Sequence, residues 1–155
     1  MCSILYLEDK NMLISSGHDG TKFWDLNDYN NINLIFYFED TWCGWNYGLC
    51  RLNQNTIIVK SKGSTLLKVI SILEKKIIKE INNPFLCWSI SLINDKGIFL
   101  VGGISNNIII YRNDNYESIQ TIQNAHDYYI RGLIELKDGS IASYSNDKKI
   151  KIWNF

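Results

Sequence analysis

Short runs of alternating hydrophobic and polar residues, separated by polar turn residues, fill the last part of the chain. The run "IRGLIEL" at 130–136 is followed by the turn "KDG" at 137–139. A second run, "SIASYS" at 140–145, leads through the polar residues 146–148 into "KIKIW" at 149–153. Alternation with a period of two is typical of half-buried β-strands, and polar residues between such runs are typical of hairpin turns. The pattern predicts three antiparallel strands joined by tight turns.

The same order of signals recurs through the whole chain with a spacing of 42 to 45 residues. The third run of each copy ends at one of four positions: Trp24, Val69, Tyr111 and Trp153. In the first three copies a fourth run follows, at 33–38, 76–81 and 118–123. A repeat of this length with four short strands is that of a propeller blade. The stretch 73–81 also fits a short helix, but its place in the repeat favours a strand.

We therefore expect an all-β fold in one domain: a partial β-propeller of about four antiparallel blades, the last lacking its outer strand. The expected blades are residues 3–38, 43–81, 86–123 and 126–155. A chain of 155 residues suits one domain and is long enough to bury a sizeable core.

The last copy resembles the WD-repeat β-propeller family. Its residues "AHDYYIRGLIELKDGSIASYSNDKKIKIWN" match the family's succession of glycine-histidine, aspartate-glycine turn, serine-rich strand, aspartate turn and tryptophan-aspartate. Ala125 stands where glycine is usual, and Asn154 where aspartate is usual. The first copy, "SSGHDGTKFWDL", contains the tryptophan-aspartate pair, but its spacing from turn to tryptophan is one residue short. The two middle copies are degenerate.

The resemblance implies a hydrogen-bonded set of histidine, serine, aspartate and tryptophan within a blade. In the last copy these residues are His126, Ser143, Asp147 and Trp153, and in the first copy Ser15, Asp19 and Trp24. An indole N–H needs an acceptor when it is buried, and a serine hydroxyl can both accept and donate. We expect this structural tetrad to brace the blade.

The last copy stops after its third strand, so ring closure is not covered by the sequence. Rings of this family usually have seven blades, and the first copy begins at Ser3 with its own first strand. We expect an incomplete propeller: a fragment of a longer protein, a short gene product or one half of an assembly. The open strand "KIKIWNF" at 149–155 is a template for pairing with another chain, including self-association.

Two aromatic segments lie where one blade's outer strand joins the next blade's inner strand, "TWCGWNYGLC" at 41–50 and "HDYYIRG" at 126–132. The resemblance places this join on the face that usually binds partners. Tyrosine, tryptophan and arginine are the favoured anchors of protein interfaces. The candidate partner-binding residues are Trp45, Tyr47, Tyr129 and Arg131. The alternative is that these side chains fill the space between blades.

The residues give little support for a catalytic site or a metal site. His126, Ser143 and Asp147 have the composition of a hydrolase triad, but the serine lies in mid-strand and lacks a glycine-rich elbow. His18 and Asp19 are two potential metal ligands without a third, and a hairpin turn explains them better. We expect no catalytic residue, no bound metal and no cofactor.

Composition and charge argue against some classes of partner and some cellular locations. The formal net charge is zero, which argues against nucleic acid or an anionic membrane as a partner. The cysteines Cys2, Cys43, Cys50 and Cys87 form no C-x-x-C pair, and we expect them to be reduced and mostly buried. No apolar run reaches the length of a membrane span, and the N-terminus lacks the basic flank of a signal peptide. We expect a cytoplasmic protein, with the nucleus as the other intracellular location.

These features favour a non-catalytic scaffold that binds partner proteins or peptides. The first alternative is a structural subunit that completes a propeller by pairing its open edge with another chain. The second is an enzyme that uses a propeller as its frame, which would require converging acids or a serine-histidine pair.

Overall fold

The computed structural model describes residues 3–41 and 48–155, and this part of the chain forms four antiparallel sheets. Blade 1 consists of β1 (Ser3–Leu7), β2 (Met12–Gly17), β3 (Gly20–Asp25) and β4 (Asn33–Phe38). Blade 2 consists of β5 (Leu49–Arg51), β6 (Thr56–Lys60), β7 (Leu66–Ser71) and β8 (Lys76–Asn82). Blade 3 consists of β9 (Cys87–Ile93), β10 (Ile98–Gly103), β11 (Ile108–Arg112) and β12 (Ser118–Ile122). Among the described residues, blade 4 consists of β13 (Ile130–Glu135), β14 (Ile141–Ser145) and β15 (Ile150–Trp153) and has no fourth strand.

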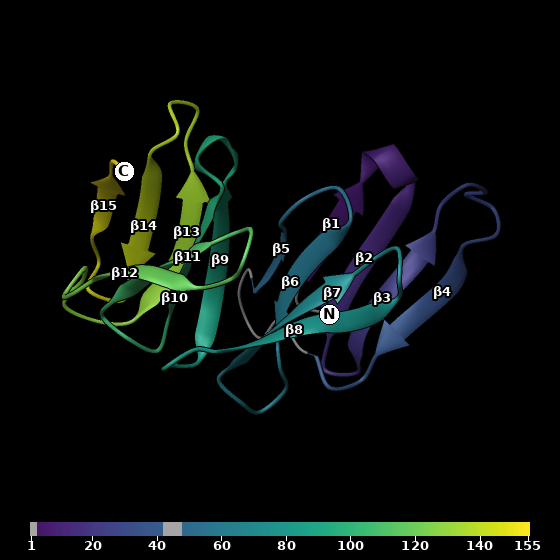
Figure 1. Ribbon diagram of the computed structural model, residues 1–155, viewed down its shortest axis with the longest axis horizontal. Coiled ribbons are helices and arrows are strands. Elements are labelled where there is room, and N and C mark those ends of the chain that lie inside the picture. The colour runs from purple at the N-terminus through teal and green to yellow at the C-terminus, as the bar shows by residue number, and fades with distance from the viewer. Residues whose placement is uncertain (1–2, 42–47) are drawn as a thin grey trace.

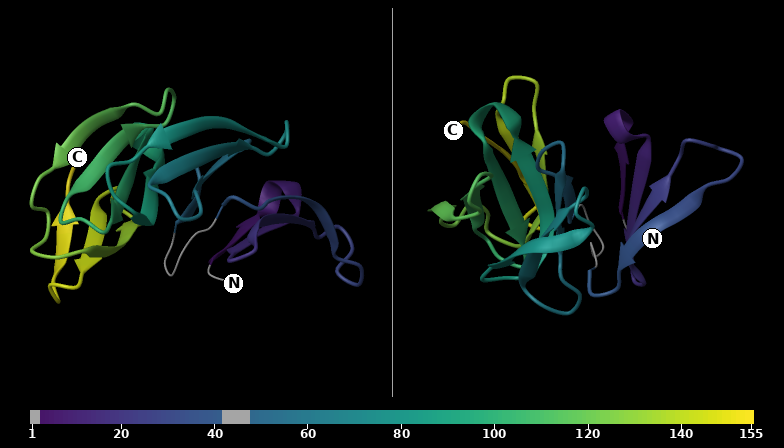
Figure 2. Two further views of the ribbon diagram at one scale, coloured as in Figure 1. Left: turned by 90° about the horizontal axis from the view of Figure 1, so that it is seen from below. Right: turned by 45° about the vertical axis from the view of Figure 1, so that its right-hand side comes forward.

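The strands of each blade are neighbours in chain order, so every sheet is a meander of hairpins. The inner strands β1, β5, β9 and β13 contact one another in that order. The blades therefore follow one another in a curved row from blade 1 to blade 4 (Figures 1 and 2). The prediction of an all-β partial propeller with about four blades is confirmed, and the stretch 73–81 contributes the strand β8.

Helical structure is confined to two short turns in the described part of the chain. They are the 3-10 helices η1 (Glu8–Lys10) and η2 (Asn94–Lys96), which connect the first two strands of blades 1 and 3. Each ends in a residue with left-handed backbone, Asn11 with φ 45° and Gly97 with φ 61°. Gly139, with φ 77°, has the same place in blade 4. Within these residues no helix is long and apolar enough to cross a membrane.

The hydrophobic core lies between the blades, in three clusters. Because strand side chains alternate, each blade has one face toward the preceding blade and one toward the following blade. Leu7, Ile14 and Phe23 of blade 1 pack against residues of blade 2, which include Ile57 and Ile70. The joins between blades 2 and 3 and between blades 3 and 4 are built in the same way.

The strand pairing corrects the sequence alignment of blade 2. In blades 1, 3 and 4 the residue at the tryptophan position pairs with the second residue after the turn between the first two strands: Trp24, Tyr111 and Trp153. The side chains of Tyr111 and Trp153 face the preceding blade. In blade 2 the residue with this pairing is Ile70, which faces blade 1. Val69, which the fixed spacing places there, faces blade 3 instead. A slip of one residue reverses the face of a strand side chain, so the tryptophan position of blade 2 is Ile70.

Candidate functional site

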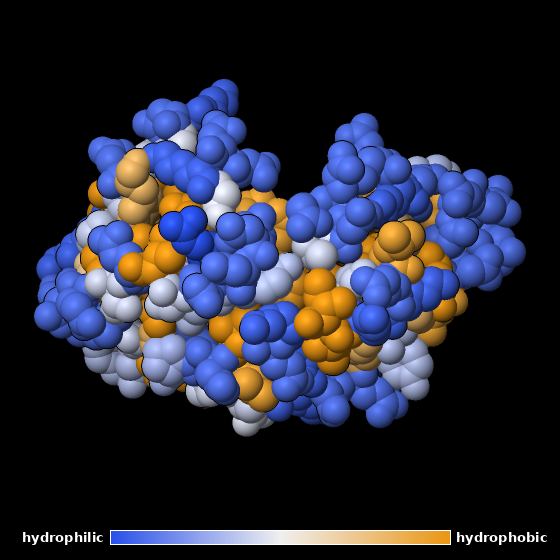
Figure 3. All heavy atoms as spheres, viewed as in Figure 1, coloured by the Kyte–Doolittle hydropathy of each residue, from blue (hydrophilic) through white to orange (hydrophobic). Residues whose placement is uncertain are grey.

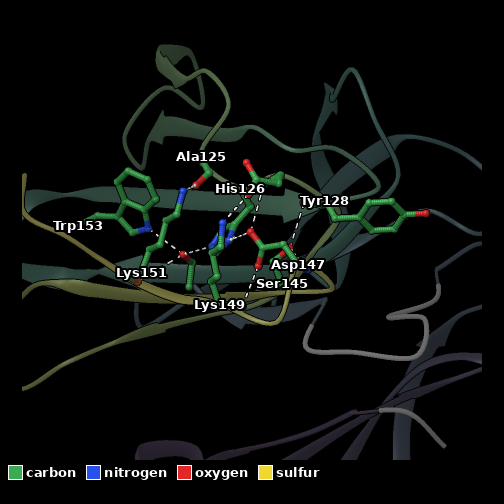
Figure 4. Close-up of polar contacts among 10 residues, drawn as sticks. Ala125, His126, Tyr128, Ser145, Asp147, Lys149, Lys151 and Trp153 are labelled. Atoms are coloured by element: carbon green, nitrogen blue, oxygen red, sulfur yellow. Dashed lines mark hydrogen bonds and ion pairs between the residues drawn. The ribbon is translucent and has the colours of Figure 1, made fainter.

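Four side chains of blade 4 form a continuous hydrogen-bonded chain (Figure 4). Trp153 on β15 donates its indole N–H to Ser143 Oγ on β14 over 2.8 Å. Ser143 Oγ lies 2.7 Å from Nε2 of His126, which precedes β13. Nδ1 of the same histidine lies 2.8 Å from Oδ2 of Asp147, in the turn between β14 and β15. These bonds thus tie the segment before β13 to β14, to β15 and to the turn between them.

The hydrogen-bond partners of the Asp147 carboxylate determine which atoms of the tetrad carry protons. Asp147 accepts backbone N–H groups from Asp127 and Lys149, at 3.1 and 2.9 Å. Burial raises the pKa of Asp147, but the hydrogen bonds from His126 and from these two backbone groups outweigh it and hold that pKa well below its usual value. When the His126 imidazole is neutral and donates Nδ1–H to the Asp147 carboxylate, its Nε2 is the acceptor for the Ser143 hydroxyl hydrogen.

This arrangement has the bond pattern of a Ser-His-Asp triad but not its accessibility. His126 and Ser143 are 0% and 1% exposed, and Ser143 Oγ is already the acceptor of the Trp153 indole. A nucleophilic serine must be open to its substrate and lie beside an oxyanion hole. The geometry therefore suits a brace within the blade.

Blade 1 contains only part of the corresponding set. Trp24 Nε1 donates to Ser15 Oγ over 2.8 Å. Asp19 does not have the position of Asp147: it pairs with Lys22, and its side chain is 69% exposed. The β2–β3 turn is a tight one, with Gly17 paired to Gly20, so Asp19 lies at its tip. The expectation that Asp19 joins the tetrad of the first copy does not match this geometry.

Blade 3 has a different polar link, which the sequence pattern did not reveal. Tyr111, in the tryptophan position, lies with its hydroxyl 2.9 Å from Oδ1 of Asn83, and both residues are 2% exposed. The amide of Asn83 also donates to the Phe85 carbonyl, in the segment before β9. Asn83 precedes its inner strand much as His126 precedes β13, and this place in the repeat is the signal that could have identified it.

An aromatic and arginine cluster lies where blades 3 and 4 join. We call Trp88, Tyr128, Tyr129 and Arg131 the join cluster. The Arg131 guanidinium stacks 4.2 Å from the Trp88 ring, and the Tyr129 ring meets Trp88 edge-on at 5.8 Å. Tyr128 and Tyr129 are 4.6 Å apart between ring centroids.

The join cluster is held from one side and exposed on the other. Arg131 Nε donates to Asn146 Oδ1 over 2.7 Å, which ties β13 to the β14–β15 turn. Tyr128 is 52% and Tyr129 is 37% exposed, and the Tyr128 side chain points away from the tetrad (Figure 4). The structure brings Tyr129 and Arg131 together on this face and adds Trp88 and Tyr128, which sequence reasoning missed. Trp45 and Tyr47 lie outside the described residues.

The remaining candidates have structural roles. His18 and Asp19 form the β2–β3 turn, and no group of three potential metal ligands occurs within residues 3–41 and 48–155. Cys50 and Cys87 are free thiols, and burial raises the pKa of each to about 12. A thiol with such a pKa is a poor nucleophile and a poor metal ligand at neutral pH.

A hollow of ≈ 830 Å³ lies among the turns that follow the inner strands of blades 1 to 3. The join cluster lies at the other end of the inner strands. Arg51 makes a bidentate ion pair with Asp9 across it, with both distances at 2.7 Å. Asn113 donates to the Leu52 carbonyl over 2.7 Å. These bonds connect neighbouring blades, and they pair Asp9 and Arg51 of the hollow with each other.

Comparison with known proteins gives the fold its context. No protein-family model and no curated protein matches the sequence. The structure is similar to the WD40 β-propeller domain of Doa1, with a TM-score of 0.75 and 16% sequence identity over 98% of this chain and 51% of that one. It is also similar to a chain of the mitotic checkpoint complex, with a TM-score of 0.82 and 14% identity over 99% of this chain and 48% of that one. The chain spans about half the length of these proteins, and its fold is that of a WD40 β-propeller, represented here by four blades.

Proposed function

We propose that this chain is a non-catalytic scaffold that binds partner proteins or peptides through the face where blades 3 and 4 join. The join cluster is the observation that carries the proposal. Its tyrosines are accessible, and its tryptophan and arginine are held in place by stacking and by a hydrogen bond. Rigid aromatic and arginine side chains on a stable frame supply most of the binding energy in protein interfaces.

The chemistry of the join cluster indicates a kind of partner. Among the described residues, the hydrogen bond of Arg131 uses Nε, so its terminal nitrogens remain for a bidentate contact with a carboxylate. The neighbouring tyrosine rings offer apolar surface and hydroxyl groups. A peptide with an acidic residue beside an aromatic or aliphatic one would use both features.

A capture experiment with matched variants tests this proposal. We expect Tyr129→Ala and Arg131→Ala each to weaken partner binding by about tenfold or more, as for a residue at the centre of an interface. Tyr29→Ala is the control, because Tyr29 is 71% exposed in the loop between β3 and β4 and lies outside the join cluster. Circular dichroism establishes that each variant is folded. Partners that bind both variants as tightly as the wild type would exclude this face.

A second candidate function rests on the missing strand of blade 4. Within the residues that the structure describes, β15 pairs only with β14, so its other edge is open. Beside this edge lies a groove of ≈ 470 Å³ whose lining includes Ile110, Ile122, Trp153 and Phe155. A strand of another protein that paired with β15 would complete the sheet and cover part of this groove.

The edge function is tested by supplying the strand in the same chain. Asn154 and Phe155 are replaced by a copy of residues 112–122, which comprise the last residue of β11, the following turn and the outer strand β12 of blade 3. We expect the added strand to pair with β15 and to abolish binding that depends on the open edge. Binding that persists unchanged in this variant would rule the edge out.

The enzyme alternative is disfavoured by the state of the serine. Ser143 is buried and bonded to Trp153, so it offers no accessible nucleophile. A screen with ester and amide substrates is the direct test, and turnover that disappears in Ser143→Ala would establish catalysis.

A further inference from the structure

The third strand of every blade carries two residues that point toward the following blade. They lie one and three positions before the tryptophan position. In blades 1 to 3 they are at most 1% exposed: Thr21, Phe23, Leu67, Val69, Ile108 and Ile110. In blade 4 the corresponding residues are Ile150 and Ile152, which are 74% and 54% exposed. The same positions are therefore buried wherever a following blade exists and open where none does.

The rest of this face of blade 4 is apolar too. Strand pairing places Tyr144 opposite Ile150, and Ala142 between Ile152 and Ile134. Ile134 is 61% and Tyr144 is 41% exposed. We call this surface the leading face. Exposed apolar surface of this kind in a soluble protein marks a contact site.

Blade 1 presents the complementary surface at the other end of the row. Ile4 on its inner strand is 51% exposed, whereas the residues with the same pairing in blades 2, 3 and 4 are only 5–8% exposed: Leu49, Ile90 and Leu133. Tyr6 and Leu34 lie on the same face in one row with Leu13 and Trp24, and they are 48% and 45% exposed. We call this surface the trailing face.

The internal joins show which surfaces fit each other. Each join packs the face of one blade that points forward against the face of the next blade that points back. The leading face and the trailing face are the two halves of such a join, and no other blade formed by residues 3–41 and 48–155 packs against either of them. Figure 3 shows one side of the molecule, where hydrophobic side chains reach the surface between polar ones.

We propose that a second copy of this chain covers both end faces, with the leading face of each copy against the trailing face of the other. Two head-to-tail contacts of one kind close a ring of two copies and eight blades. Since this chain covers 51% and 48% of the propeller chains that it resembles, two copies have the length of one such chain. The contact uses sheet faces, and it is independent of both the join cluster and the β15 edge.

Sedimentation velocity on the wild-type chain and on two lysine variants tests the assembly. At tens of micromolar we expect the wild type to have twice the 18.0 kDa mass of the chain. Ile152→Lys damages the leading face and Ile4→Lys damages the trailing face, and each variant should dissociate at least about tenfold more readily because a charge enters an apolar contact. Leu73→Lys is the control, since Leu73 is 77% exposed in the β7–β8 turn.

Mixing the two variants identifies the geometry of the contact. The leading face of Ile4→Lys and the trailing face of Ile152→Lys are both intact, so a mixture should form a heterodimer through one undamaged contact. If copies associated through identical faces, one of the two variants alone would dimerise like the wild type.

Three results would overturn the proposal. The first is a wild-type chain that stays monomeric at about 100 micromolar, which would leave the faces to another protein or to further blades. The second is dimerisation that neither lysine variant weakens. The third is open-ended growth, which means that the head-to-tail contact does not close. Recovery of association in the mixture also shows that both variants are folded.

Discussion

At the scale of single residues, Ser143 shows how burial changes what a chemical group can do. Its hydroxyl oxygen accepts the Trp153 indole N–H and lies within hydrogen-bonding distance of His126 Nε2. The same atom in an open pocket would be a candidate nucleophile. Here its two partners and its 1% exposure make it the centre of a brace between strands.

Ser143→Ala should lower the free energy of unfolding by about 1–3 kcal/mol, because the indole N–H of the half-buried Trp153 and a ring nitrogen of the buried His126 both lose their partner. Ser15→Ala in blade 1 is the matched comparison and should cost less, because Trp24 is half-buried like Trp153 but Ser15 has no histidine partner among the described residues. Urea denaturation measures both. Equal losses would mean that the histidine adds nothing to the brace.

Asp147 gives the brace a defined dependence on pH. The pKa of Asp147 in the folded chain lies below its value of about 3.9 in an unfolded chain, so the carboxylate is favoured by folding. Its contribution to stability is therefore complete above about pH 5 and is lost as the pH falls below about 4. We expect the stability difference between the wild type and Asp147→Asn to be largest near pH 7 and to shrink toward pH 3. Thermal melts across this range provide the measurement, and a difference that grows on acidification would contradict the assignment.

At the scale of strands and turns, the sequence was informative wherever the period of two was unbroken. Hairpins and blade order followed from alternation and spacing. The set His126, Ser143, Asp147 and Trp153 was implied by the resemblance of the last copy to the WD-repeat family, and the structure brings these four residues together.

The fixed spacing places Val69 in the tryptophan position of blade 2, one residue before Ile70, which has that position in the structure. A fixed spacing does not allow for turns of different length. The prediction that Asp19 has the position of Asp147 fails for a related reason: the β2–β3 turn is one residue shorter than the β14–β15 turn.

Contacts between blades were the part that the sequence could not reveal. Trp88 and Arg131 stack although 43 positions separate them, and no local pattern specifies that they meet. Within blade 3, Tyr111 likewise bonds Asn83 although 28 positions separate them. A pair such as Trp88 and Arg131 depends on how the sheets are stacked, and stacking follows from packing of whole faces.

Close packing between strands makes a further prediction at this scale. A Cβ on Gly103 would lie 2.0 Å from the backbone oxygen of Leu86, which cannot move without breaking the β9–β10 pairing. A Cβ on Gly132 would meet the Tyr144 ring, which is 41% exposed and can rotate away. We expect Gly103→Ala to destabilise the chain by about 2 kcal/mol or more, and Gly132→Ala by clearly less. Chemical denaturation of the two variants decides it, and a reversed order would show that the bulge near Gly103 can relax.

At the scale of the whole molecule, stability depends on stacking, because each cluster of the core belongs to two blades at once. Blades 2 and 3 are covered on both faces, whereas blades 1 and 4 are each covered on one. In a stacked array the local stability follows the number of neighbours.

Backbone amides of β10 in the monomer should therefore exchange with deuterium far more slowly than those of β15. If two copies close the ring, raising the protein concentration should slow exchange in β1 and β15 and leave β10 unchanged. Exchange in β15 that is as slow as in β10 at low micromolar concentration would show that blade 4 needs no following blade, and the argument from its exposed isoleucines would fail.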